Sequence, residues 1–98
     1  MKLEFAKRAL RDIERKGRKW LEECDEKDLF ERELEDAFKR IKNGPQAGQY
    51  YTMHRDRRVL RVLMKKTENH VYYRQDAPGL VRVLCVWGAR RKSGPKLG

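Results

Sequence analysis

The sequence predicts a single α+β domain over residues 1–98, in which an N-terminal strand and a helical hairpin precede a three-strand antiparallel meander. Three observations support this fold class. The spacing of apolar residues changes from every second residue to every third or fourth residue and then back again. A break at residues 43–45 separates the helical part from the later strands. The length of 98 residues suits one domain with one modest core.

The opening "MKLEF" predicts a short strand, because Leu3 and Phe5 share one side and the charged residues between them share the other. From residue 6 onward, the apolar positions predict an amphipathic helix. These positions are Ala6, Ala9, Leu10, Ile13, Gly17, Trp20, Leu21 and Cys24.

A second helix is expected to begin near "DEKD", where Asp25 can accept hydrogen bonds from the first backbone amides. Its inner stripe consists of Phe30, Leu34, Ala37, Phe38 and Ile41. At "NGP", Asn43 or Gly44 is expected to adopt a left-handed cap conformation, and Pro45 cannot continue the helix. We therefore expect a helical hairpin that packs on one face of the sheet.

Residues 46–56 are expected to form a loop, and three strands are expected after it, in "RRVLRVLMKK", "HVYYR" and "LVRVLCVW". In the first of these, one face carries Leu60, Val62 and Met64, and the other carries Arg61, Leu63 and Lys65. With the opening strand, the meander gives a four-strand sheet. Residues 93–98 have a tail-like composition and are expected to be partly disordered.

The net charge of +10 is concentrated in the second half of the chain. Residues 1–53 contain 13 Lys and Arg against 12 Asp and Glu, whereas residues 54–98 contain 12 against 3. A cationic half of this kind attracts nucleic acid, an anionic membrane or an acidic protein, and a surplus of Lys and Arg also serves solubility.

Several functional classes are disfavoured. Cys24 and Cys85 form no CxxC pair, and His54 and His70 lie far from either, so we expect buried thiols and no metal or cofactor. The N-terminus lacks the apolar centre of a signal peptide, and no window approaches the roughly 20 apolar residues of a membrane span. We expect a cytoplasmic protein.

The candidate binding residues for a target or a nucleic acid are cations of the meander and the tail. They are Arg61, Lys65, Arg82, Arg90, Arg91 and Lys92. Arg82 lies in the middle of a strand, where a charge is hard to bury. Two ordinary explanations remain open for it: its side chain can reach solvent along an apolar surface, or it can pair with Glu68 or Asp76.

His70 and Tyr72 are the candidate acid–base or base-stacking residues, and the period of two places them on the same strand face. A histidine at the start of a strand is more often a partly exposed structural residue. Tyr72 and Tyr73 point to opposite faces, so at least one of them belongs to the core.

The element order and the stretches "RRVLRVLMKKTENHVYYR" and "VRVLCVWGARR" resemble the RelE/ParE toxin superfamily of bacterial toxin–antitoxin systems. The resemblance covers nearly the whole chain, including Tyr73-Arg74 at the end of one strand and Arg90-Arg91 after the last. Two positions depart from the family pattern. Ala6 stands where a Ser or Thr commonly caps the first helix, and Gly88 stands where many members carry His.

This resemblance implies one of two activities: RelE-like toxins cut messenger RNA in the ribosome, and ParE-like toxins interfere with DNA gyrase without being nucleases. Metal-free RNA cleavage needs a base and an acid. No His or Tyr follows Tyr73, and no acidic residue follows Asp76. We therefore favour ParE-like inhibition of gyrase. The alternatives are a RelE-like endoribonuclease using His70 or a lysine of lowered pKa, and a nucleic-acid-binding module without toxin activity.

The resemblance also implies a cognate antitoxin that wraps the toxin, with a helix against the helical hairpin and an extended segment on the sheet. An acidic antitoxin would complement the basic half. The candidate contact residues are Trp20, Leu29 and Trp87, although tryptophan in so small a domain is more often part of the core.

Overall fold

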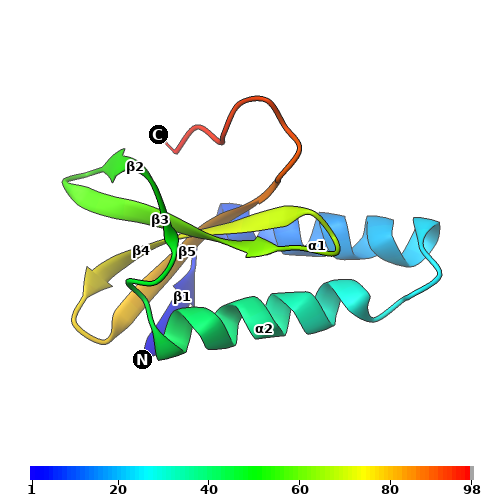
Figure 1. Ribbon diagram of the computed structural model, residues 1–98, viewed down its shortest axis with the longest axis horizontal. Coiled ribbons are helices and arrows are strands. Elements are labelled where there is room, and N and C mark those ends of the chain that lie inside the picture. Colours follow the sequence, from blue (N-terminus) through cyan, green and yellow to red (C-terminus); the bar gives the residue numbers. More distant parts are fainter. Residues whose placement is uncertain (98) are drawn as a thin grey trace.

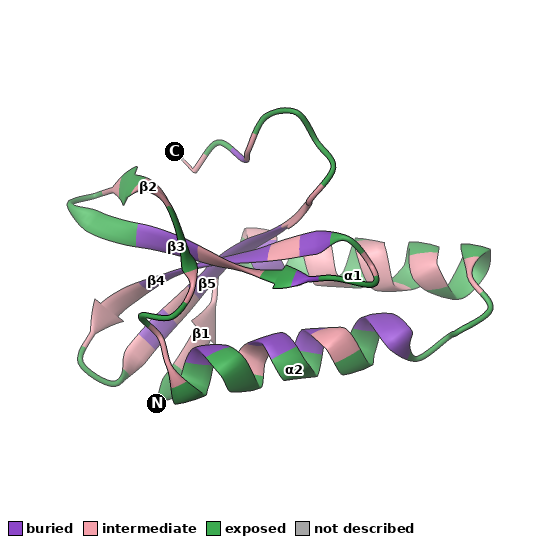
Figure 2. Cartoon of the chain, in the orientation of Figure 1, coloured by how far each residue is buried: buried purple, intermediate pink, exposed green. Residues whose placement is uncertain are grey.

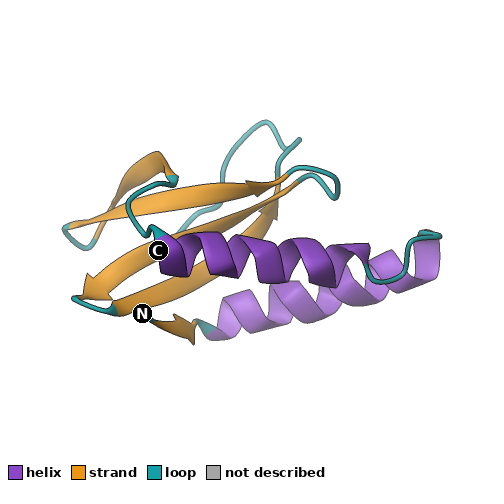
Figure 3. Ribbon diagram, turned by 60° about the horizontal axis from the view of Figure 1, so that its bottom comes forward, coloured by secondary structure: helices purple, strands orange, loops and turns teal. Residues whose placement is uncertain are grey.

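The computed structural model describes residues 1–97 and consists of two helices and one five-strand sheet (Figure 1). The strand order is β1-β5-β4-β3-β2, in which β1 runs parallel to β5 and all other neighbours are antiparallel. Both helices lie on the same face of the sheet (Figure 3). The elements are β1 (Lys2–Phe5), α1 (Lys7–Glu23), α2 (Leu29–Asn43), β2 (Gln49–His54), β3 (Arg57–Met64), β4 (Asn69–Ala77) and β5 (Leu80–Gly88).

The α+β class, the helical hairpin and the meander are confirmed, but the predicted loop at residues 46–56 is wrong. It contains β2, so the sheet has five strands instead of four. β2 joins β3 through Arg55 and Asp56, whose φ angles are 52° and 62°. Tight hairpins of this type usually carry Asn-Gly or Asp-Gly, and Arg-Asp hides the turn from a sequence-based prediction.

The ends of α2 also differ from the prediction. The helix begins at Leu29 instead of near Asp25, because residues 24–28 form the connection between the helices. Trp20 closes this connection by donating its Nε1–H to the Glu26 carbonyl at 2.6 Å. At the other end Gly44 has a φ of −155°, so the helix ends without a left-handed cap. Within residues 1–97, neither helix is long and apolar enough to cross a membrane.

The main core lies between the helices and the inner face of the sheet (Figure 2). The predicted stripe of α2 points into it, and so do Leu60 and Met64 of β3. The prediction for α1 is only partly correct, because Leu10 and Leu21 are each 53% exposed. The buried core residues are Ala9, Phe30, Leu34, Ala37, Ile41, Leu60, Met64, Val71, Tyr73, Val81, Val83 and Val86.

A second, smaller cluster covers the outer face, which is the sheet face turned away from the helices. It contains Val59, Tyr72, Leu84 and Cys85, with Tyr51, Trp87 and Leu97 packed against it. Tyr72 and Tyr73 therefore lie on opposite faces, as predicted, and each is only 1% exposed. Residues 93–97 of the tail lie over this face with Pro95 buried (Figure 1). Gly98 lies outside the described residues.

Candidate functional site

The centre of the outer face is organised around Arg61. Its Nε donates to Gln49 Oε1 at 2.9 Å, and its Nη1 donates to the Tyr72 hydroxyl at 3.1 Å. The guanidinium carbon also lies 5.9 Å from the ring centres of both Tyr51 and Tyr72, within the range of a cation–π interaction. The sequence correctly placed Arg61 on this face, and the structure adds that it is held by aromatic neighbours.

His70 is adjacent to Tyr72, with ring centroids 6.0 Å apart. Burial, assisted by the charge of Arg61, lowers the pKa of His70 below its ordinary value. A neutral imidazole can accept a proton, which is the chemistry of a general base. Tyr72 is 1% exposed, so its hydroxyl is not accessible to a substrate in this arrangement. The two predicted residues are neighbours, but His70 alone is partly exposed.

Two cations lie over Trp87 at the end of β5, and a third, Lys16, feels the charge of one of them. The guanidinium carbons of Arg91 and Arg8 lie 4.1 and 5.7 Å from its ring centre. Lys16 lies two helical turns after Arg8, and burial together with the charges of Arg15 and Arg91 lowers its pKa. α1 therefore contributes to the cationic surface that the sequence had assigned to the meander and tail alone.

Further exposed cations occupy the same end of the sheet. Lys65 lies in the β3–β4 turn, and this turn is joined to the chain after β5 by a hydrogen bond from the Ala89 amide to the Glu68 carbonyl at 2.8 Å. Arg90 pairs with the Glu68 carboxylate at 2.6 Å, but their side chains are 84% and 45% exposed. Such exposed pairs contribute only about 0–1 kcal/mol. Arg90 and the exposed Lys92 are thus available to a partner.

Arg82 does not belong to this group. It shares the outer face with Arg61, but it pairs with Glu4 of β1 at 3.5 Å. Glu68 and Asp76 were the partners that the sequence suggested. Glu4 takes this role because β1 runs parallel to β5 and places Glu4 directly beside Arg82. We therefore regard Arg82 mainly as part of the β1–β5 contact.

The sequence analysis missed a cluster formed by Arg74, Asp76 and His54. Arg74 is 8% exposed, and its Nε and Nη2 donate to the Asp76 carboxylate at 2.5 and 3.1 Å. Its Nη1 lies 2.9 Å from His54 Nδ1, which must accept because a guanidinium can only donate. The hydrogen bonds from Arg74 lower the pKa of Asp76 despite its partial burial. This pair could have been found from the sequence, because Arg74 and Asp76 are two residues apart on one strand and therefore share a face.

The residues predicted to contact an antitoxin have structural roles. Leu29 was expected to be free to contact an antitoxin, but it is buried at 8% exposure because it is the first residue of α2 at the junction of the helices. Trp20 is half-buried against the core and holds the helix connection, as described above. Trp87 lies on the outer face, where its Nε1–H donates to the Ser93 carbonyl at 3.0 Å.

The exposed apolar surface of the hairpin lies elsewhere, on α1 and in the groove between the helices. Leu10 and Leu21 are exposed, and Leu21 lines a shallow hollow of about 400 Å³. Gly17 faces the Phe30 ring here, and a Cβ at this position would meet the ring at an ordinary contact distance of 3.7 Å. The hollow is lined mainly by Ile13, Gly17, Leu21, Phe30 and Leu34, with charged residues at its rim.

Within residues 1–97 no group of three or more His, Cys, Asp or Glu side chains is arranged to hold a metal ion. The outer face of the described residues carries cations, aromatic rings and two partly exposed imidazoles, those of His54 and His70.

Comparison with known proteins identifies one family. The sequence model described as the ParE toxin of the type II toxin–antitoxin system, parDE, matches residues 3–93. No curated protein sequence matches the chain. The matched region includes all seven elements except the first residue of β1, together with the cations at the end of β5.

Proposed function

The chain belongs to the ParE toxin family of type II toxin–antitoxin systems, and on that premise we propose that it inhibits DNA gyrase by binding, without cutting a nucleic acid. The observation that carries this proposal is the exposed cationic surface at the end of β5. Arg90, Arg91 and Lys92 are all exposed, whereas the tyrosine of the neighbouring His70–Tyr72 pair is buried. Binding requires only the cations, but cleavage also requires an accessible acid and base.

The cationic surface is suited to an anionic partner. Among carboxylates of the described residues, only Glu68 pairs with one of these three terminal cations, and that pair is largely exposed. Arg91 is positioned by stacking on Trp87, so it loses less side-chain freedom on binding than an unrestrained arginine would. We propose that Arg90, Arg91 and Lys92, with Lys65 and Arg61 nearby, form the surface that contacts gyrase in the cytoplasm.

A supercoiling assay with purified gyrase tests this proposal. The wild-type chain is expected to reduce the supercoiling of relaxed plasmid. Arg91→Ala should need about fivefold more protein for the same effect, which corresponds to a loss on the order of 1 kcal/mol. Arg32→Ala, which changes an exposed arginine on α2, serves as the matched control and should behave like the wild type. Unchanged supercoiling at saturating wild-type protein would reject gyrase as the target.

The antitoxin is proposed to be acidic and to place an amphipathic helix along the hairpin groove. The groove offers the exposed Leu21, and the charged residues that line it are Glu14, Arg18 and Glu31. Apolar anchors at helical spacing suit such a groove. Co-expression with candidate antitoxins should show that Leu21→Glu weakens the complex without changing gyrase inhibition. An undiminished complex would place the antitoxin elsewhere.

His70 supports a second candidate, ribosome-dependent cleavage of messenger RNA. Its lowered pKa leaves it neutral and able to act as a base beside Arg61, which can stabilise phosphate charge. In a purified translation system, this candidate predicts cut messenger RNA with the wild-type chain and intact RNA with His70→Gln. Intact messenger RNA with the wild-type chain would reject it.

A further inference from the structure

The chain after β5 is bound to the outer face through its carbonyl groups. Trp87 Nε1–H donates to the Ser93 carbonyl at 3.0 Å, and the Tyr51 hydroxyl donates to the Pro95 carbonyl at 3.0 Å. The Arg8 guanidinium donates to the Lys96 carbonyl. Three donors from β5, β2 and α1 thus hold one short extended segment. Recognition of backbone carbonyls by aromatic side chains is a common way to bind extended, proline-containing peptides.

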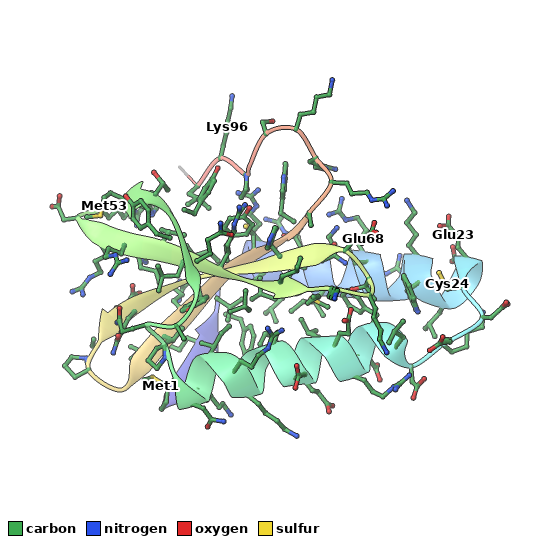
Figure 4. The ribbon with its side chains drawn as sticks, viewed as in Figure 1. Met1, Glu23, Cys24, Met53, Glu68 and Lys96 are labelled. Atoms are coloured by element: carbon green, nitrogen blue, oxygen red, sulfur yellow. The ribbon has the colours of Figure 1, made fainter. Side chains whose placement is uncertain are left out.

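The side chains of the segment fit the same surface. Pro95 is buried, and Leu97 packs against the outer-face cluster that contains Tyr72. Lys96 between them is exposed, and its side chain points away from the sheet (Figure 4). This alternation of inward and outward residues is that of a docked peptide.

Gly94 is the tightest point of the contact. A Cβ at this position would lie 2.2 Å from the Tyr51 hydroxyl oxygen and 2.5 Å from the ring carbon that carries it. The Tyr51 ring cannot easily move aside, because it packs edge to face on the buried Tyr72 at 4.9 Å and its hydroxyl is bonded to Pro95. Glycine is therefore required here for close approach.

We propose that residues 93–97 form a strap that occupies an aromatic groove on the outer face and gates access to the surface around Tyr51, Tyr72 and Arg61. The docked strap covers the rings against which the Arg61 guanidinium lies. Docking is held by only three side-chain hydrogen bonds and two apolar side chains. The five residues regain conformational entropy on release, so the free energy that holds the strap is small. Release makes Tyr51 accessible and exposes the part of the outer face beside the terminal cations.

This gate is relevant to toxicity in a way that depends on the function proposed above. If the outer face binds gyrase, the docked strap leaves only the cationic end of that face available for the contact. Release of the strap then adds the aromatic surface and strengthens inhibition.

The test compares the full-length wild-type chain with Gly94→Ala and Leu97→Asp, which loosen the strap at different points. Gly44→Ala is the matched control, because a Cβ there meets only Ala47 at an ordinary 3.5 Å. Two readouts report release: trypsin cleavage after Lys96, and nitration of Tyr51 by tetranitromethane relative to the exposed Tyr50. Both should increase severalfold in the two strap variants and remain at the wild-type level in Gly44→Ala.

Wild-type rates of both reactions in Gly94→Ala and Leu97→Asp would overturn the strap. Faster cleavage without increased nitration of Tyr51 would also overturn it, because the strap would then cover nothing. In the supercoiling assay, Gly94→Ala should inhibit gyrase at severalfold lower concentration than the wild type, and equal inhibition would contradict gating of that target. Failure of every chain to inhibit gyrase would reject the proposed function, whereas cleavage and nitration would still decide the strap.

Discussion

Replacement of Arg74 by methionine is expected to destabilise the fold by about 3 kcal/mol at neutral pH. Methionine retains much of the apolar stem but removes the guanidinium, which bonds the Asp76 carboxylate twice and His54 once. Removing one partner from a fully buried ion pair costs about 3–5 kcal/mol. The Arg74 side chain is 10% exposed and that of Asp76 is 26% exposed. Water can therefore solvate the Asp76 carboxylate in part once the guanidinium is removed, and the cost lies at the lower end of this range.

The loss should depend on pH, because the hydrogen bonds from Arg74 hold the pKa of Asp76 below its ordinary value. A carboxyl group whose pKa is lowered by folding contributes stability above its unfolded pKa, and this contribution disappears as pH falls through the folded value. The difference between the wild type and Arg74→Met should therefore be largest near neutrality. It should shrink as the pH falls below about 4, the ordinary range of a carboxyl group.

Urea unfolding followed by far-ultraviolet circular dichroism measures both effects, with the free energy of unfolding compared at neutral pH and in acid. Arg32→Met is the control, because Arg32 makes ion pairs whose side chains are all more than half exposed. It should change the free energy by no more than about 1 kcal/mol. A loss below about 1 kcal/mol for Arg74→Met, or an equal loss at both pH values, would refute the role assigned to the Arg74–Asp76 pair.

Two further measurements address other buried contacts. Glu33 accepts hydrogen bonds from the amides of the β3–β4 turn at 2.9 and 2.8 Å, and although burial opposes it, these bonds lower its pKa. Glu33→Gln should therefore cost about 1 kcal/mol at neutral pH and less in acid, as read by urea unfolding; equal losses at both pH values would contradict this role. Burial raises the pKa of Cys85 to about 11, so iodoacetamide at mildly alkaline pH should modify the half-buried Cys24 first, and Cys85 only on unfolding. Mass spectrometry of the modified peptides checks the order, and equal rates would show that the outer-face cluster opens freely.

Much of the fold could be predicted from local periodicity, because the inner face binds the helices through regularly spaced apolar residues. Phe30, Leu34 and Ile41 recur at helical spacing, and all three are buried. β2 escaped prediction because its identity depends on pairing with β3, and its turn is Arg55-Asp56 instead of the Asn-Gly or Asp-Gly of typical tight hairpins. The strand β2 is therefore specified by long-range pairing with β3 and not by its local sequence pattern.

The candidate site was predictable only as far as strand alternation reaches. Alternation placed Arg61 on the outer face, but it could not show that Glu4 pairs with Arg82, since that contact requires the parallel β1–β5 pairing. The docking of the tail was also hidden, because Gly94 and Pro95 are typical of flexible segments as well as of tight contacts. Their role becomes evident only where Tyr51 comes within reach.

The positions of the two proposed surfaces constrain how an antitoxin could neutralise this toxin. The helices lie on one face of the sheet (Figure 3), and Trp87 with its cations lies on the other. A helix confined to the hairpin groove therefore leaves the cations at the end of β5 uncovered. α1 is the element that reaches both sides: Leu21 lines the groove, whereas Arg8 lies over Trp87 and the charge of Arg91 acts on Lys16. Under the two proposals made above, neutralisation by steric cover requires an acidic segment that continues from the groove along α1 to Arg91. Such a segment would meet the strap at Arg8, where the Lys96 carbonyl is held, so antitoxin binding and strap docking are expected to compete for the same guanidinium.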